Sequence, residues 1–307
     1  MKILVTDGIS GTAADQLKEL GHEVVEKYMD VEELKEAVKE FDAIIIRSAT
    51  KIRRETIDSA AITGKLRLAI RAGVGTDNID ADYAEENGIA VRNTPRASSD
   101  AVAELAIAHM LCAARFIGAA NATMRAGKWN KNSYTGTELS GKRLGLIGFG
   151  RIARETARKA RALGMKIYYT NRAGDKNYSD YKWLPMEELL RKVDFVSIHT
   201  PFDKDRGALI GEKEIAMMKD GVYIINTARG GVVNEKALLD ALNSGKVAGA
   251  GIDVFEEEPT SNMELINHER VSATPHIGAS TREAQSRIGI EIVNIINNWE
   301  GKDEQSL

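Results

Sequence analysis

Three ionisable side chains lie in short segments rich in glycine and proline. Arg229 is in NTARGG, Glu258 in DVFEEEP and His276 in ATPHIGAS. A guanidinium can hold a carboxylate through two parallel hydrogen bonds, and an imidazole can exchange a proton with a substrate oxygen. A carboxylate on the far nitrogen of that imidazole orients the ring and favours its protonated form. Together they predict hydride transfer at a 2-hydroxy acid, with His276 as the proton carrier and Glu258 as its orienter.

Taken singly, each of these residues has a simpler interpretation. A histidine beside a turn is most often structural or merely exposed, and Glu258 ends an EEE run that could be solvated charge. Their position favours a shared site. All three segments follow apolar runs typical of strands, and ligands of open parallel sheets bind at the carboxyl ends of the strands.

Two series of short apolar segments alternate with charged helical segments. The first contains KILVTD, EVVEKY, DAIIIRS, LRLAIRAG and GIAVRNTP, and the second contains RLGLIGFG, MKIYYTN, DFVSIHTP, GVYIINTA and VAGAGIDVF. This alternation predicts parallel sheets with helical crossovers. The expected fold is α/β, with two Rossmann-like doubly wound domains.

A chain of 307 residues is expected to form two domains. We predict a flavodoxin-like substrate-binding domain from residues 1–97 and 280–307, and a dinucleotide-binding domain from residues 98–279. The substrate domain is discontinuous because the last helix, with IGIEIVNIINNW, is too short to form a domain of its own. It is therefore expected to cross back onto the first series.

Residues 101–120 form the only run that suggests a membrane span. Glu104, His109 and Arg115 interrupt it where charge is costly, so one long, mostly buried helix is expected instead. Its Cys112 is the only cysteine of the chain, which excludes an internal disulfide and fits a reducing cytosol. No signal peptide is apparent, and we expect a cytoplasmic protein.

The overall composition indicates a soluble globular protein. Hydrophobic residues make up 43% and charged residues 28%, and the net charge of −3 is spread without long blocks of one sign. We therefore expect no nucleic-acid partner and no membrane partner. No metal site is predicted.

A glycine-rich motif predicts the dinucleotide site. Gly148, Gly150 and Ala153 form G-x-G-x-x-A after a strand and at the start of a helix, where a pyrophosphate can bind the free N–H groups. A purely structural glycine turn is the alternative. The next strand ends at Asn171, where NAD-binding domains carry an acidic residue. Arg172 could therefore pair with the 2′-phosphate of NADP, or Asn171 could still bond the diol of NAD. NAD is expected, and NADP use stays open.

Seven motifs occur in order along nearly the whole chain: RAGVGTDNID, NTP, GFGRIARETA, HTP, NTARGG, GIDVFEEEP and TPHIGAS. With them the sequence resembles the D-isomer-specific 2-hydroxyacid dehydrogenases. IRSATKI and AGKWNKNSYTGTELSGK are similar to segments of the phosphoglycerate dehydrogenases within that family. The resemblance implies an NAD(P)-dependent enzyme that interconverts D-3-phosphoglycerate and 3-phosphohydroxypyruvate, the first step of serine biosynthesis.

The resemblance also implies a role for individual residues. Arg229, Glu258 and His276 match the family's catalytic Arg, Glu and His. The implied cofactor positions are Val74, Gly148, Gly150, Arg151, Ile152, Asn171, Arg172, Thr200, Pro201, Thr227, Ala228, Asp253, Gly278 and Ala279. The implied substrate positions are Arg47, Ser48, Gly73, Val74 and Gly75, with Arg47 meeting the phosphate and Lys51 nearby. For Arg47, a salt bridge between domains is the alternative.

Two further expectations follow from the resemblance, and two alternatives stay open. A homodimer through the cofactor domain is implied, and residues 101–120 would suit that interface or the core. The regulatory domain of longer phosphoglycerate dehydrogenases is not expected here. The alternatives are a glyoxylate or hydroxypyruvate reductase of the same family and, in another class, a dinucleotide-sensing protein like the corepressors built on this fold.

Overall fold

The computed structural model describes residues 1–303, without the side chains of 300–303. The chain folds into two compact units. Unit 1 contains Met1–Ser98 and the segment that begins at Ala279, and unit 2 contains Ser99–Gly278. The boundaries expected from sequence, after residues 97 and 279, lie one residue from these.

Unit 1 contains one parallel sheet in the order β2-β1-β3-β4-β5, which is the flavodoxin-like order. Its strands are β1 (Lys2–Val5), β2 (Glu23–Glu26), β3 (Ala43–Ile46), β4 (Leu68–Arg71) and β5 (Ala90–Asn93). The central strands are buried on both faces, so their residues are continuously apolar rather than alternating.

Within the described residues of unit 1, five helices cover the sheet: α1 (Gly11–Glu19), α2 (Val31–Ala37), α3 (Arg54–Thr63), α4 (Ala81–Glu86) and α12 (Arg282–Asp303). One core cluster contains Leu17 of α1 together with Ile288 and Ile292 of α12. A second contains Leu34 of α2, Ile57 of α3 and residues of α4. The last helix of the chain therefore completes the core of the first strand–helix series.

Unit 2 contains a seven-stranded parallel sheet in the order β12-β11-β10-β9-β6-β7-β8. Its strands are β6 (Arg143–Ile147), β7 (Lys166–Thr170), β8 (Lys182–Trp183), β9 (Phe195–Ile198), β10 (Val222–Asn226), β11 (Val247–Ile252) and β12 (Val271–Ala273). The strand order reverses between β6 and β9, as in the Rossmann fold. The predicted α/β architecture with two doubly wound sheets is confirmed.

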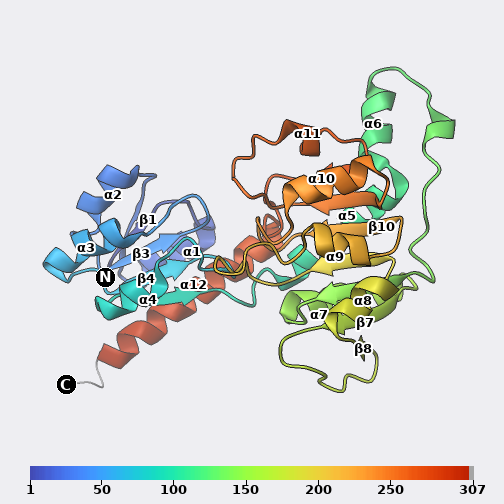
Figure 1. Ribbon diagram of the computed structural model, residues 1–307. Coiled ribbons are helices and arrows are strands. Elements are labelled where there is room, and N and C mark those ends of the chain that lie inside the picture. The colour runs from blue at the N-terminus through green and yellow to red at the C-terminus, as the bar shows by residue number, and fades with distance from the viewer. Residues whose placement is uncertain (304–307) are drawn as a thin grey trace. The chain divides into compact units, whose positions relative to one another are not determined.

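Helices cover both faces of this sheet. On one face lie α8 (Met186–Lys192), α9 (Glu212–Met217) and α10 (Glu235–Asn243), side by side in Figure 1, and they share one core cluster. On the other face lie α5 (Ser99–Arg115) and α7 (Arg151–Ala162), in a second cluster. A single turn, α11 (Met263–Ile266), precedes β12.

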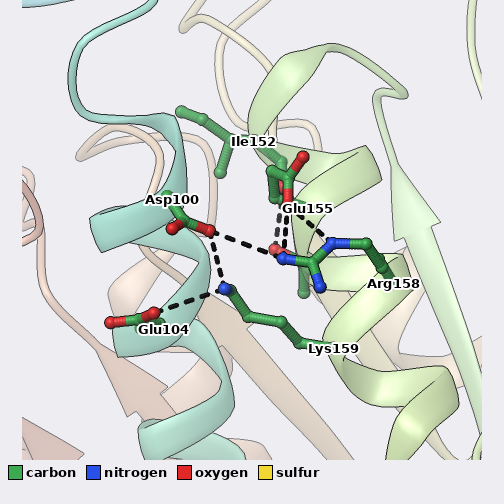
Figure 2. Close-up of polar contacts among 7 residues, drawn as sticks. Asp100, Glu104, Ile152, Glu155, Arg158 and Lys159 are labelled. Carbon is green, nitrogen blue, oxygen red and sulfur yellow. Dashed lines mark hydrogen bonds and ion pairs between the residues drawn. The ribbon is translucent and has the colours of Figure 1, made fainter.

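Ion pairs join α5 to α7 at their exposed rim (Figure 2). Lys159 Nζ of α7 lies 2.6 Å from a carboxylate oxygen of Asp100 and 3.3 Å from one of Glu104, both on α5. Arg158 lies 3.8 Å from Asp100. Glu104, one of the charges that interrupt the apolar run, therefore faces the rim rather than the core.

The expected single helix over residues 101–120 is wrong at its C-terminal end. Phe116 adopts a left-handed conformation with φ of 52°, and α6 (Ile117–Arg125) leaves α5 at 66°. No residue of α6 is buried within the described chain, and Figure 1 shows it standing away from the sheet. The carbonyl of Ala114 accepts a hydrogen bond from Thr137 N at 2.8 Å, which gives the end of α5 a partner outside the helix.

Among the described residues, no single helix has the length and apolar character to cross a membrane, although the bent pair of α5 and α6 meets that test by length and composition alone.

One carboxylate ties together the amino ends of three neighbouring strands of unit 2. Asp194, before β9, bonds Lys219 at 2.6 Å and both the backbone and the side chain of Arg143, at the start of β6. Burial alone would raise the pKa of Asp194, but these hydrogen bonds outweigh it and lower the pKa to about 2. This edge of the sheet is therefore structural, and the opposite edge carries the candidate site.

Candidate active site

The loop that carries His276 is held by one buried carboxylate. Asp253, at the end of β11, is 1% exposed. Its carboxylate accepts hydrogen bonds from Ile277 N at 2.8 Å, from Gly278 N at 2.9 Å and from the hydroxyl of Thr274. Its carbonyl accepts one from His276 N at 2.8 Å. His276 has a φ of 52°, a conformation that non-glycine residues adopt rarely, so these bonds offset local strain.

His276 and Glu258 form a hydrogen-bonded pair. His276 Nδ1 lies 2.7 Å from Glu258 Oε2, and the side chains are 30% and 35% exposed. The other oxygen of Glu258 accepts from Phe255 N at 3.1 Å. Burial raises the pKa of Glu258, but the bond from His276, the Phe255 N–H and the charge of Arg229 outweigh it and leave the pKa lowered. The carboxylate thus stays ionised and holds the ring, leaving Nε2 for a substrate.

Arg229 lies within electrostatic reach of this pair. It follows β10 in a turn tied by Asn226, whose side chain donates to Arg229 O at 2.9 Å and accepts from Ala228 N at 3.1 Å. The next residue, Gly230, touches the loop of Glu258 so closely that a Cβ there would lie 1.6 Å from Phe255 O. The structure therefore brings the three predicted catalytic residues to one edge of unit 2.

Sequence reasoning missed Asn226 and Gly230. Both lie inside the motif NTARGG, and the only signal was the glycine pair after a strand. No group of three or more His, Cys, Asp or Glu side chains that could hold a metal ion occurs in residues 1–303.

The predicted dinucleotide motif lies at the switch point of the sheet, between β6 and β9. Gly148 has a φ of 83°, and a Cβ on it would lie 2.6 Å from the carbonyl oxygen of His199, so only glycine fits. Gly150 caps α7 without a side-chain hydrogen bond, which leaves N–H groups of Arg151 and Ile152 for an anion. Beside it is a cavity of about 830 Å³ lined by, among others, Gly148, Asn171, Arg172, Thr200 and Pro201.

Three buried polar atoms on this edge have no hydrogen-bond partner in the part of the chain that the structure describes. They are Asn171 Oδ1, Thr200 Oγ1 and Thr227 Oγ1, all at predicted cofactor positions. Buried polar atoms are normally satisfied, so these await a ligand with several hydroxyl and amide groups. A nicotinamide dinucleotide fits them. Asp253 and Gly278 were also predicted to bind cofactor. In the structure the Asp253 carboxylate holds the His276 loop, and it does so in part by accepting from Gly278 N.

Charged residues surround the Asn171 end of the cavity. Arg172 and Arg206 lie 3.3 Å and 3.4 Å from the same carboxylate oxygen, that of Asp203. Their side chains are 79% and 72% exposed. Two cations therefore lie at this end of the cavity, and one carboxylate pairs with both.

The predicted substrate residues lie in unit 1, after β3 and β4, which are neighbouring strands. Asp7 accepts hydrogen bonds from Arg47 N at 2.7 Å and Thr50 N at 3.0 Å, and Asn78 donates to Arg47 O at 2.6 Å. Asp7 and Asn78 were not foreseen. Gly73 has a φ of 157°, and the Arg71 guanidinium occupies the place of its absent Cβ. Val74 and Ala279, predicted to bind cofactor, also belong to unit 1.

Comparison with known proteins agrees with this geometry. Residues 107–278 match the model of the D-isomer specific 2-hydroxyacid dehydrogenase NAD binding domain. The chain is 45% identical over 277 residues to the hydroxypyruvate reductase of Thermotoga maritima, covering 89% of this chain and 90% of that one. It is 42% identical over 306 residues to the human D-3-phosphoglycerate dehydrogenase, covering 98% of this chain and 57% of that one.

A solved structure shows the same architecture. The glyoxylate reductase from Paecilomyes thermophila superposes with a TM-score of 0.88 at 35% identity, covering 97% of this chain and 94% of that one. The chain thus spans a little over half the length of the phosphoglycerate dehydrogenase relative and nearly all of the two reductases. With a family model over more than half of its residues and relatives above 40% identity, the chain belongs to the D-isomer-specific 2-hydroxyacid dehydrogenases.

Proposed function

We propose that the substrate pair of this dehydrogenase is D-3-phosphoglycerate and 3-phosphohydroxypyruvate, which would place it in serine biosynthesis. The chemistry is carried by the His276–Glu258 pair at 2.7 Å. The choice of substrate is supported by Arg47, whose loop is held by Asp7 and Asn78, and by the similarity to phosphoglycerate dehydrogenases over 98% of the chain.

In the proposed reaction each residue has one step. Arg229 binds the substrate carboxylate and polarises the adjacent carbonyl. A nicotinamide cofactor, when bound, would supply or accept the hydride at the substrate's C2. During reduction, His276 Nε2 donates its proton to the C2 oxygen, and during oxidation it takes that proton back. Glu258 holds the ring through Nδ1 in both directions. Arg47 binds the phosphate, which the smaller 2-keto acids lack.

The second candidate is a hydroxypyruvate or glyoxylate reductase. It is favoured by the Thermotoga maritima relative, of which this chain covers 90%. The two candidates differ in whether a cation recognises a phosphate on C3. For the cofactor we propose NAD, with NADP as the alternative that Arg172 and Arg206 support.

Initial reduction rates with 3-phosphohydroxypyruvate, hydroxypyruvate and glyoxylate, each with NADH and NADPH, test the proposal. We expect the largest kcat/KM for the phosphorylated acid, and Arg47→Ala should lower that value while sparing hydroxypyruvate. Equal losses for both acids, or a preference for the smaller acids in the unmodified enzyme, would favour the reductase. Dinucleotide binding without turnover of any acid would favour the sensor.

We further propose a cytoplasmic homodimer. The lone cysteine suits a reducing compartment. The dimer is supported by large apolar side chains on and after α6, where Ile117, Met124 and Trp129 are 49%, 54% and 79% exposed. Light scattering should give twice the mass of one chain, and replacing Met124 and Trp129 by Glu and Lys should yield monomers. A monomeric unmodified protein would contradict this.

A further inference from the structure

His109 is a buried histidine that the proposed chemistry does not use. It lies on α5 and is 2% exposed. Its Nδ1 lies 2.9 Å from Ser272 Oγ and its Nε2 3.0 Å from Thr274 Oγ1. Ser272 lies in β12, and Thr274 directly follows that strand, two positions before His276. The two bonds fix the ring plane against the strand that leads into the site.

The neighbours of His109 determine the direction of these bonds. Thr274 has one hydroxyl proton, and it donates that proton to the carboxylate of Asp253. Thr274 Oγ1 must therefore accept from His109, so Nε2 carries the hydrogen. In the neutral ring Nδ1 then accepts from Ser272. Burial lowers the pKa of His109, although the charge of Asp253 opposes this, and the neutral ring is the form that fits both contacts.

A glycine on the sheet lets His109 reach this position. A Cβ on Gly251 of β11 would lie 2.4 Å from the Cβ of His109. The strand therefore has no side chain where the histidine crosses it. From there a continuous series of contacts runs from His109 through the hydroxyl of Thr274 to Asp253, and from Asp253 to the N–H groups of His276, Ile277 and Gly278.

We propose that His109 is a positioning residue for proton transfer. By donating to Thr274 it fixes the hydroxyl that bonds Asp253, and Asp253 in turn holds the loop that presents His276. The proposal rests on the proposed role of His276. The competing explanation is that His109 merely fills the core between α5 and β11. That explanation predicts a loss of stability without a specific loss of rate, and no preference for one hydrogen-bonding replacement over another.

Two amide replacements separate these explanations, because each mimics one ring nitrogen. The amide of Gln reaches the place of Nε2 and can donate to Thr274, whereas that of Asn reaches the place of Nδ1 and can bond only Ser272. We expect His109→Leu to lower kcat by about 10- to 100-fold. The dinucleotide Kd should change much less, since Gly148 and Gly150 of the phosphate loop take no part in these contacts. His109→Gln should restore most of kcat, and His109→Asn should not.

A double-mutant cycle tests the coupling through Thr274. His109→Leu and Thr274→Val should each lower kcat, and the double variant should lose little more than either alone. Met110→Leu, a buried neighbour on α5 with no part in these contacts, is the packing control and should keep the kcat of the unmodified enzyme. Additive losses, equal rescue by Asn and Gln, or an unchanged kcat in His109→Leu would each overturn the proposal.

Hydrogen–deuterium exchange gives a readout that does not depend on turnover. The peptide that contains Ile277 and Gly278 should exchange faster in His109→Leu and Thr274→Val, and return toward the unmodified rate in His109→Gln. Unchanged exchange in His109→Leu would overturn the positioning role even if the rate fell. If the unmodified enzyme turned over no 2-keto acid, the proposed function would fail, while the exchange data would still decide whether His109 holds this loop.

Discussion

Gly230→Ala should separate the two loops that carry Arg229 and Glu258. A Cβ on Gly230 would lie 1.6 Å from Phe255 O, whereas ordinary contacts begin at 3.4 Å, so the loops must move apart by the difference, about 1.8 Å. Gly230 has no positive φ, so the backbone conformation would accept alanine, and the contact with Phe255 O is what disfavours it. Overpacking of this kind costs about 1–3 kcal/mol of stability.

The catalytic cost should exceed the stability cost. A misplacement of about 1 Å can lower a rate about 100-fold, and here Arg229, the proposed ligand of the substrate carboxylate, would move relative to the pair of Glu258 and His276. We expect kcat/KM for the preferred 2-keto acid to fall at least about 100-fold, equivalent to about 2.7 kcal/mol of transition-state stabilisation. The dinucleotide Kd should change less than kcat/KM, because the phosphate loop with Gly148 and Gly150 follows another strand, β6, although Thr227 and Ala228 share the loop of Gly230.

The assay compares steady-state rates with circular dichroism melting and dinucleotide binding by fluorescence. Gly118→Ala is the matched control, since it lies in α6 with nothing in the same chain within 4 Å of the added Cβ. Because α6 is part of the proposed dimer surface, light scattering should first show an unchanged mass, and the rate should then equal that of the unmodified enzyme. A folded Gly230→Ala variant with kcat/KM within about threefold of the unmodified enzyme would refute the idea that this contact sets the geometry of the site.

Three further perturbations test other parts of the structure. Asp203→Asn should release Arg172, which lies beside Asn171, and raise the NADPH-to-NADH ratio of kcat/KM about fivefold, equivalent to the ~1 kcal/mol of an exposed pair. The ratio should fall back in high salt. An unchanged ratio at low salt would rule out that Asp203 competes with the 2′-phosphate for Arg172. Asp194→Asn should cost about 2 kcal/mol at pH 7, because its pKa is lowered from 3.8 to about 2. A lowered carboxyl pKa stabilises the fold above pH 4, and this stabilisation is lost as the pH falls through 2. Urea unfolding should therefore show that the difference in the free energy of unfolding between the variant and the unmodified protein shrinks from pH 4 downwards. A difference that stays constant with pH would contradict this. His276→Ala should abolish turnover in stopped-flow assays and leave dinucleotide affinity intact, and substantial residual activity would disprove the acid–base assignment.

The architecture was predictable because its signals are local. Buried parallel strands give continuous apolar runs, and the glycines of the phosphate loop are required by the backbone itself, as the 83° φ of Gly148 shows. The strand β8 was missed because two residues at a sheet edge carry no period. The break at Phe116 was missed because AVAELAIAHMLCAARFIGAA contains neither proline nor an internal polar turn, and what ends α5 is a contact from Thr137.

The candidate site divides in the same way. Arg229, Glu258 and His276 could be named from sequence because their residue types have few chemical uses in such loops. Asn226 and Asp7 could not, because their roles are hydrogen bonds to segments that only the fold brings near. His109 was counted merely as a polar interruption of an apolar run, since its partners Ser272 and Thr274 are more than 160 residues away.

The placement of α12 in the core of unit 1 has a consequence for biosynthesis on the ribosome. Unit 2 is a continuous segment, and its sheet and both helical layers are complete once residue 278 has emerged. The sheet of unit 1 is made far earlier, yet the cluster around Leu17 lacks Ile288, Ile292 and Ile296 until the last helix is synthesised. Because domains generally fold as units during synthesis, unit 1 matures after unit 2 although residues 1–98 precede it in the chain. The apolar strands of unit 1 are the surface that a chaperone would need to shield meanwhile.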